Sequence, residues 1–197
     1  ALCTSLETIA LPKNITVPTN QFVIRPGGGD DTTMFTSCTG LRSIAFHSSA
    51  GNDTLTLANT TTTGALTATG NKSLPAAGNL TVSISASDIG GALKIQGGSG
   101  NDTAWFTDSS VGGPLTFVGN AGNDRLNAFH TISVPEPHEI IPGRTSFLGG
   151  PGNDEFNIDN LAFGGPFGFD GGPGDDVLDV EGSDFGPTAI VSGGDGN

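Results

Sequence analysis

The stretch Gly149-Gly150-Pro151-Gly152-Asn153-Asp154-Glu155-Phe156-Asn157 joins a glycine-rich turn to a run in which polar and apolar residues alternate. Glycine adopts the positive φ values that sharp bends require, and Asn and Asp side chains accept hydrogen bonds from nearby backbone. Alternation of apolar and polar residues is typical of a strand with one buried face. The stretch therefore predicts a tight turn that leads directly into a β-strand.

This turn recurs along the whole chain at a nearly constant spacing. Gly-Asn-Asp or a close variant ends at six aspartates, and Leu80 takes the same position in a degenerate copy. The intervals between the seven positions are 22, 27, 22, 22, 30 and 22 residues, so the repeat unit contains about 22 residues. The six aspartates are Asp31, Asp53, Asp102, Asp124, Asp154 and Asp176.

The two longer intervals predict loop insertions. One is expected within residues 59–73, which are rich in Thr, and the other within residues 134–142, which contain three prolines. Insertions in repeat proteins form loops that project from the repeat. Residues 1–20 precede the first unit, and we expect them to form an N-terminal segment or cap.

Apolar residues recur at five positions of each unit. Two precede the turn, two follow the aspartate position by two and four residues, and one follows it by nine. A unit of this size cannot bury these side chains alone, so successive units must stack about 4.8 Å apart. Glycine is 32 of 197 residues and interrupts every helical pattern. The sequence therefore predicts an all-β fold: a single-domain, right-handed parallel β-helix (β-solenoid) with seven to eight coils, its hand following the rule for parallel crossovers.

The charge of the chain excludes several partners. Lys and Arg number 7 against 20 Asp and Glu, giving a formal net charge of −13. Nucleic acid and anionic lipid should be repelled, and no apolar run is long enough to cross a membrane. The two cysteines, Cys3 and Cys38, fit either a disulfide that ties the N-terminal segment to the first coil or two separate buried thiols.

Stacking would place the aspartates in one column. Carboxylates about 5 Å apart repel each other by around 1 kcal/mol per pair even in water. A hard cation between coils would remove this repulsion, and calcium prefers six to eight oxygen ligands. The alternative is a metal-free ladder of Asn and Asp turns. In either case Leu80 contributes no carboxylate and interrupts the column.

The turn resembles the haemolysin-type (RTX) calcium-binding repeat, whose signature is Gly-Gly-x-Gly-x-Asp-x-apolar-x. Residues 97–105, 149–157 and 171–179 match it fully, and the rest of each coil resembles the right-handed β-helix of large secreted bacterial adhesins and cell-surface proteins. The family's repeats are contiguous nonapeptides, whereas here the motif occurs once per 22 residues, so a single edge would bind metal. The resemblance implies an extracellular or cell-surface protein with calcium as its cofactor. It assigns Asp102, Asp124, Asp154 and Asp176 as the principal ligands, with Asp31 and Asp53 as weaker ones.

These observations predict a non-enzymatic structural or adhesive protein, such as a stiff stalk, surface-layer or filament subunit. Its partners would be a further copy stacked head to tail, or a continuation of the chain. A polysaccharide-acting β-helix enzyme is the first alternative, and His138 with Glu136 and Glu139 is its only candidate cluster.

An ice-binding solenoid is the second alternative, because Thr54, Thr56, Thr81 and Thr103 are expected on one outer face. Trp105 is expected on the same face, as a carbohydrate or cell-surface contact or as one exposed aromatic residue.

Overall fold

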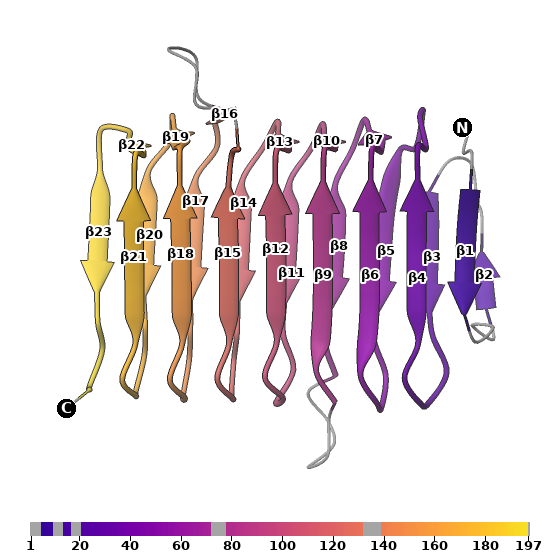
Figure 1. Ribbon diagram of the computed structural model, residues 1–197, viewed down its shortest axis with the longest axis horizontal. Coiled ribbons are helices and arrows are strands. Elements are labelled where there is room, and N and C mark those ends of the chain that lie inside the picture. Colours follow the sequence, from indigo (N-terminus) through magenta and orange to yellow (C-terminus); the bar gives the residue numbers. More distant parts are fainter. Residues whose placement is uncertain (1–4, 10–13, 17–20, 72–77, 132–138, 197) are drawn as a thin grey trace.

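The computed structural model describes residues 5–9, 14–16, 21–71, 78–131 and 139–196. Over these residues the chain is all-β, with 23 strands and no helix (Figure 1). It follows that no helix long and apolar enough to cross a membrane occurs in this part of the chain. The predicted all-β class is confirmed.

Two long sheets extend along the long axis of the molecule and face each other (Figure 1). The eight-stranded sheet contains β1 (Ser5–Ile9), β4 (Thr32–Thr36), β6 (Asp53–Ala58), β9 (Leu80–Ser85), β12 (Thr103–Thr107), β15 (Arg125–Phe129), β18 (Glu155–Asp159) and β21 (Val177–Glu181). The nine-stranded sheet contains β2 (Asn14–Thr16), β3 (Gln21–Arg25), β5 (Ser43–His47), β8 (Leu66–Thr69), β11 (Leu93–Gln96), β14 (Leu115–Val118), β17 (Thr145–Leu148), β20 (Phe167–Asp170) and β23 (Ala189–Ser192).

Short strands form a third, narrower face. One three-stranded sheet contains β7 (Thr61–Thr62), β10 (Asp88–Ile89) and β13 (Ser110–Val111). The other contains β16 (Glu139–Ile141), β19 (Leu161–Phe163) and β22 (Asp184–Phe185). The chain passes from the eight-stranded sheet through a short strand to the nine-stranded sheet and then returns, a path compatible with the predicted β-solenoid.

The register of the parallel strands follows the repeat read from the sequence. Thr32 pairs with Thr54, and Thr81 pairs with Thr103, each 22 residues apart. The two N-terminal strands pair in the antiparallel direction instead: β1 pairs with β4, and β2 pairs with β3. The N-terminal segment therefore covers the first strand of each long sheet.

The positions predicted for the two insertions need correction. Residues 59–69 were expected within a loop, but they form β7 and β8 in regular register, with Thr60 and Thr62 facing inward and buried. The five extra residues of this unit fall between Thr69 and Leu80. The sequence alone predicted a loop here because threonine occurs both in buried strands and in solvent-exposed loops.

The second insertion is also shorter than predicted. Within residues 134–142, residues 139–141 form β16, which pairs with β19 in regular register. Ile141 is fully buried and pairs with Phe163, so it is the inward residue of its unit's third face. The remaining extra residues lie between Thr131 and Glu139, and most of them fall outside the described part of the chain.

The core lies between the sheets and is built from the predicted inward positions. The side chains that alternate inward along β6, β9 and β12 are fully buried. Toward the C-terminal end the core becomes aromatic: Phe156 contacts Phe117, Phe147 and Phe169 with ring centroids 5.0–6.0 Å apart. Each fully buried Phe or Leu stabilises the fold by roughly 1.5–3 kcal/mol. Packing between units, rather than within one unit, therefore holds the molecule together.

Cys38 is disulfide-bonded and buried. The only other cysteine of the chain is Cys3, which lies outside the described residues. Of the two alternatives left open by the sequence, the disulfide is the one that the structure contains.

Candidate functional site at the aspartate turns

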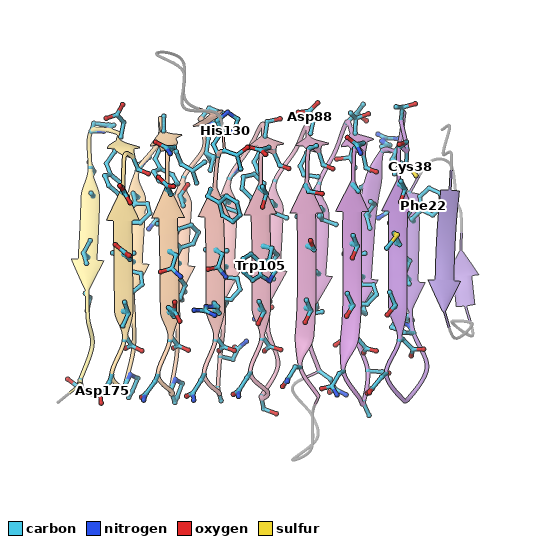
Figure 2. All side chains as sticks on the ribbon, viewed as in Figure 1. Phe22, Cys38, Asp88, Trp105, His130 and Asp175 are labelled. Atoms are coloured by element: carbon cyan, nitrogen blue, oxygen red, sulfur yellow. The ribbon has the colours of Figure 1, made fainter. Side chains whose placement is uncertain are left out.

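The six aspartates lie at one edge of the eight-stranded sheet, where each turn enters a strand. We call this the aspartate edge; it is the edge at which Asp175 is labelled in Figure 2. Five of its members are buried to 96% or more, and Asp176 is half-buried. The buried members are Asp31, Asp53, Asp102, Asp124 and Asp154.

In five of the six aspartates, all but Asp31, one carboxylate oxygen accepts a hydrogen bond from the described backbone of the preceding unit. Oδ1 of Asp124 accepts a hydrogen bond from the backbone N–H of Asp102 at 2.7 Å, and Oδ1 of Asp154 accepts one from Asp124 at 2.7 Å. The same bond joins Asp176 to Asp154 at 2.9 Å and Asp53 to Asp31 at 3.2 Å. The column is thus a ladder in which each carboxylate satisfies a buried N–H of its neighbour.

Leu80 interrupts this ladder in one direction only. Its own N–H still donates to Oδ1 of Asp102 at 2.6 Å. Because Leu80 has no carboxylate, the N–H of Asp53 donates instead to the backbone carbonyl of Asn79 at 3.0 Å. The predicted break in the carboxylate column between Asp53 and Asp102 is therefore present.

The second carboxylate oxygen divides the aspartates into two groups. Oδ2 of Asp53 accepts a hydrogen bond from the N–H of Ser49 at 2.8 Å, and Oδ2 of Asp102 accepts one from Gly98 at 2.6 Å. In the other group Oδ2 is buried and has no hydrogen-bond partner within the described residues. This second group is Asp31, Asp124, Asp154 and Asp176.

The turn backbone explains the difference. Asn120 and Gly150 occupy the position equivalent to Gly98, with φ of 81° and 113°. Their N–H groups donate to the carbonyls of Gly149 and Gly171 in the next unit, both at 2.9 Å. The N–H that serves Oδ2 in the Asp102 turn is therefore committed elsewhere in the turns of Asp124 and Asp154.

The first glycine of each turn leaves the space into which the carboxylate folds. A Cβ at Gly119 would clash with Oδ2 of Asp124 and with the carbonyl oxygen of Gly149 in the next unit. Gly97 and Gly149 are placed in the same way relative to their own aspartates. A carboxylate oxygen and a carbonyl oxygen of the next unit thus both lie beside each of these glycines, and at Gly119 and Gly149 the carboxylate oxygen is one without a hydrogen-bond donor in the described residues.

Burial at this edge makes the carboxylates weak acids. Desolvation raises the pKa of Asp102 and of Asp154 to about 6 and that of Asp124 to about 7. The neighbouring carboxylates in the column raise the pKa of Asp124 and Asp154 further, whereas hydrogen bonds from backbone N–H groups lower it. Desolvation also raises the pKa of Asp53. The column is therefore short of positive charge.

A second ladder, made by the Asn of each Asn-Asp pair, lies on the exposed side of the same turns. Oδ1 of Asn101 accepts a hydrogen bond from the N–H of Asn123 at 2.8 Å, and Asn123 does the same for Asn153 at 2.8 Å. These bonds run toward the next unit, whereas the aspartate bonds run toward the preceding one. The recurrent Asn-Asp pair therefore joins a turn to both of its neighbours. In the sequence, the repetition of this pair is the pattern that indicates the two ladders.

The opposite edge of the eight-stranded sheet carries a ladder of hydroxyl groups, which we call the hydroxyl edge: Thr60, Ser87, Ser109 and Ser183. Ser87 Oγ donates to the carbonyl of Ser85 at 2.7 Å and accepts from the N–H of Thr60 at 3.0 Å. The residue before each hydroxyl has φ of 46–57°. The signal in the sequence was a hydroxyl residue seven positions after the aspartate slot.

Other residues singled out in the sequence form less complete groupings. His138 and Glu136 lie outside the described residues, as do the side-chain contacts of Glu139. In the described chain, His130 lies 3.1 Å from Asp108, which also accepts two hydrogen bonds from Thr131 at 2.7 Å. Thr32, Thr54, Thr81 and Thr103 form one column on the outer face of the eight-stranded sheet, but Arg125 and Glu155 continue it.

The aspartate edge supplies the kind of ligand that a hard cation takes, at one carboxylate per unit. No group of three or more His, Cys, Asp or Glu side chains placed to hold a metal occurs in the described ranges. An ion at this edge would therefore depend on backbone carbonyls and water in addition to Oδ2. The buried, unpartnered Oδ2 atoms of Asp124, Asp154 and Asp176 match that requirement best.

Comparisons with known proteins give no further guidance: no protein family, curated protein or solved structure matches the chain.

Proposed function

We propose that this protein is a non-enzymatic extracellular β-solenoid that acts as a stiff structural or adhesive element and is stabilised by calcium at its aspartate edge. The solenoid would be closed and right-handed, with seven to eight coils of about 22 residues. The parallel sheets with their constant register support this architecture, and the hand follows the rule for parallel crossovers.

The observation that carries the calcium proposal is the buried Oδ2 of Asp124 and of Asp154, which has no hydrogen-bond partner. A buried polar atom without a partner costs about 1–3 kcal/mol, and more when it is charged. A cation beside Oδ2 would remove this penalty and the repulsion along the column. The approach of the next unit's carbonyl oxygen beside the leading glycine adds a second oxygen ligand of the kind that calcium prefers.

One feature of the structure supports the extracellular setting, and the calcium proposal is consistent with it. Cys38 is disulfide-bonded, and disulfides persist in oxidising surroundings such as the cell exterior. Calcium that binds only the stacked state would add its binding free energy to the stability of the fold. A chain secreted unfolded into calcium-rich surroundings would then fold there.

Stacking of a further unit on the last strands would extend the rod. Strands β21, β22 and β23 each pair on one side only within the described residues. Phe185 and Val191 are 38% and 60% exposed, although they occupy positions that face inward in preceding units. A second copy or a continuation of the chain would bury them. Sedimentation at increasing protein concentration separates the two, because only stacked copies give a concentration-dependent mass.

Thermal unfolding followed by circular dichroism tests the calcium proposal. We expect excess calcium to raise the melting temperature by about 5–10 °C relative to excess chelator, since occupancy of even one site at 100 times its Kd contributes about 2.7 kcal/mol. Magnesium, which demands near-ideal octahedral geometry, serves as the control and should give a smaller rise. Identical melts in calcium and chelator would refute the calcium proposal while leaving the β-solenoid architecture intact.

A further inference from the structure

Trp105 is the only tryptophan of the chain, and it lies on the outer face of the eight-stranded sheet. Figure 2 shows it on β12, midway between the two edges of the sheet. Its side chain is 39% exposed. The ring of Phe129 meets the indole at 88° with centroids 6.5 Å apart, an edge-to-face contact that restrains the indole orientation.

Small and planar polar side chains flank the indole along one column of the sheet. Ser83 pairs with Trp105 on one side, Asn127 pairs with it on the other, and Asn157 follows Asn127. Nδ2 of Asn157 donates to Oδ1 of Asn127 at 3.0 Å and to Oε1 of Glu155 at 2.8 Å. The group Ser83, Trp105, Asn127, Asn157 and Glu155, which we call the Trp105 platform, extends over four adjacent strands.

We propose that the Trp105 platform binds a neutral glycan. The face of an aromatic ring carries partial negative charge and attracts the C–H groups of a sugar ring, while amide, carboxylate and hydroxyl groups bind the sugar's hydroxyls. Nδ2 of Asn127 has no hydrogen-bond partner in the described structure, although the residue is only 7% exposed. A ligand hydroxyl would satisfy this donor once the buried amide of Asn127 turns toward the surface.

The charges around the platform favour a neutral glycan over an acidic one. Arg125 is the cation nearest to the column, and its guanidinium is paired with Glu155. The chain as a whole carries a formal charge of −13, which repels a polyanion. An acidic polysaccharide would therefore meet a carboxylate and find no uncommitted cation on this platform.

The composition of the patch also favours a glycan over a protein partner. A stable protein interface buries about 800 Å² on each partner around an apolar centre. Here one indole is surrounded by polar side chains, and the other exposed large apolar residues lie elsewhere: Leu148 on the nine-stranded sheet, and Val177, Phe185, Ile190 and Val191 on the last strands. A single aromatic ring among hydrogen-bonding groups suits a sugar chain, which is itself amphipathic.

Affinity electrophoresis tests this inference, which does not depend on the calcium proposal. The protein is run with calcium through native gels that contain hydroxyethylcellulose, glucomannan or laminarin, with polygalacturonate as the anionic control. Fluorescence titration with cellohexaose, laminarihexaose or mannohexaose reports on the platform directly, because Trp105 is the only tryptophan. We expect retardation by at least one neutral polysaccharide and a change in Trp105 emission with the matching oligosaccharide.

Variants assign the binding to this surface. Trp105→Ala should weaken binding about tenfold or more, and Trp105→Phe and Asn157→Ala should weaken it less. Leu148→Ala is the matched control, because Leu148 is equally exposed at 40% but lies on the other long sheet, and it should bind as wild type does. Absence of binding to every neutral polysaccharide, unchanged binding in Trp105→Ala, or equal retardation by polygalacturonate would overturn the inference.

Discussion

The aspartate edge and the hydroxyl edge lie at opposite ends of the strands of the eight-stranded sheet, and both tie each unit to the next. At each edge a buried side-chain oxygen accepts a hydrogen bond from the backbone of the preceding unit. The hydroxyl of Ser109 also donates to its own strand, so it is fully satisfied and neutral. The carboxylate of Asp154 has only one of its two oxygens satisfied and adds a buried charge.

The difference between the edges shows that keeping the units in register does not require charge. Serine and threonine do this at the hydroxyl edge with neutral groups. Aspartate at the other edge brings desolvation and repulsion between neighbours, which raise the pKa of Asp124 to about 7. The aspartate column therefore costs more free energy than register alone requires, and a countercharge from calcium is the compensation that we propose.

The largest loss of stability at either edge should come from removing a carboxylate altogether. In calcium-free buffer at pH 7.5, Asp124→Ala should unfold with a free energy about 2 kcal/mol lower than Asp124→Asn, because alanine leaves the buried N–H of Asp102 without an acceptor. Asparagine retains that acceptor and removes the charge, so it should be at least as stable as wild type. Urea unfolding of the three proteins measures this, and equal stability of the Ala and Asn variants would contradict the ladder.

The second-largest effect should be a change in the stability of the folded state with pH. The pKa values of Asp102, Asp124 and Asp154 lie above the unfolded value of 3.8, at about 6, 7 and 6. The folded state therefore binds more protons than the unfolded state between these values. The stability that protonation provides is fully present below the unfolded pKa and is lost as pH rises through the folded pKa values.

We accordingly expect the chelated protein to melt on the order of 5 °C lower at pH 8 than at pH 5. Differential scanning calorimetry across this range provides the measurement. Asp124→Asn should flatten the profile. A melting temperature that rises steadily toward pH 8 in chelator would show that the carboxylates are not destabilised by burial.

The smallest effect should come from the hydroxyl edge. Ser87→Ala leaves the N–H of Thr60 without its acceptor and should lower the free energy of unfolding by about 1 kcal/mol. Because no charge is involved, the loss should be the same in calcium and in chelator, and at pH 5 and pH 8. A loss that depends on calcium would remove the distinction between the two edges.

The sequence predicted the β-class, the 22-residue register and most inward positions, because alternation and spacing depend on short-range geometry that each unit repeats. It misplaced the insertions, because a buried Thr60 or Thr62 cannot be told from a surface Thr without knowing its neighbours. The sequence motif also ranked Asp102 with Asp124 and Asp154. Only the turn backbone, with φ of 81° at Asn120, shows which carboxylate oxygens are left without a donor.

The central claim is most directly tested by the calcium-induced rise in melting temperature of wild type, Asp102→Asn and Asp154→Asn at pH 7.5. Both variants keep the Oδ1 acceptor, but of these two aspartates only Asp154 has a buried Oδ2 without a partner. The account predicts that Asp102→Asn keeps the full calcium response, whereas Asp154→Asn loses a clear part of it and retains the part that Asp124 and Asp176 provide. An equal response in the two variants, or none in wild type, would contradict it.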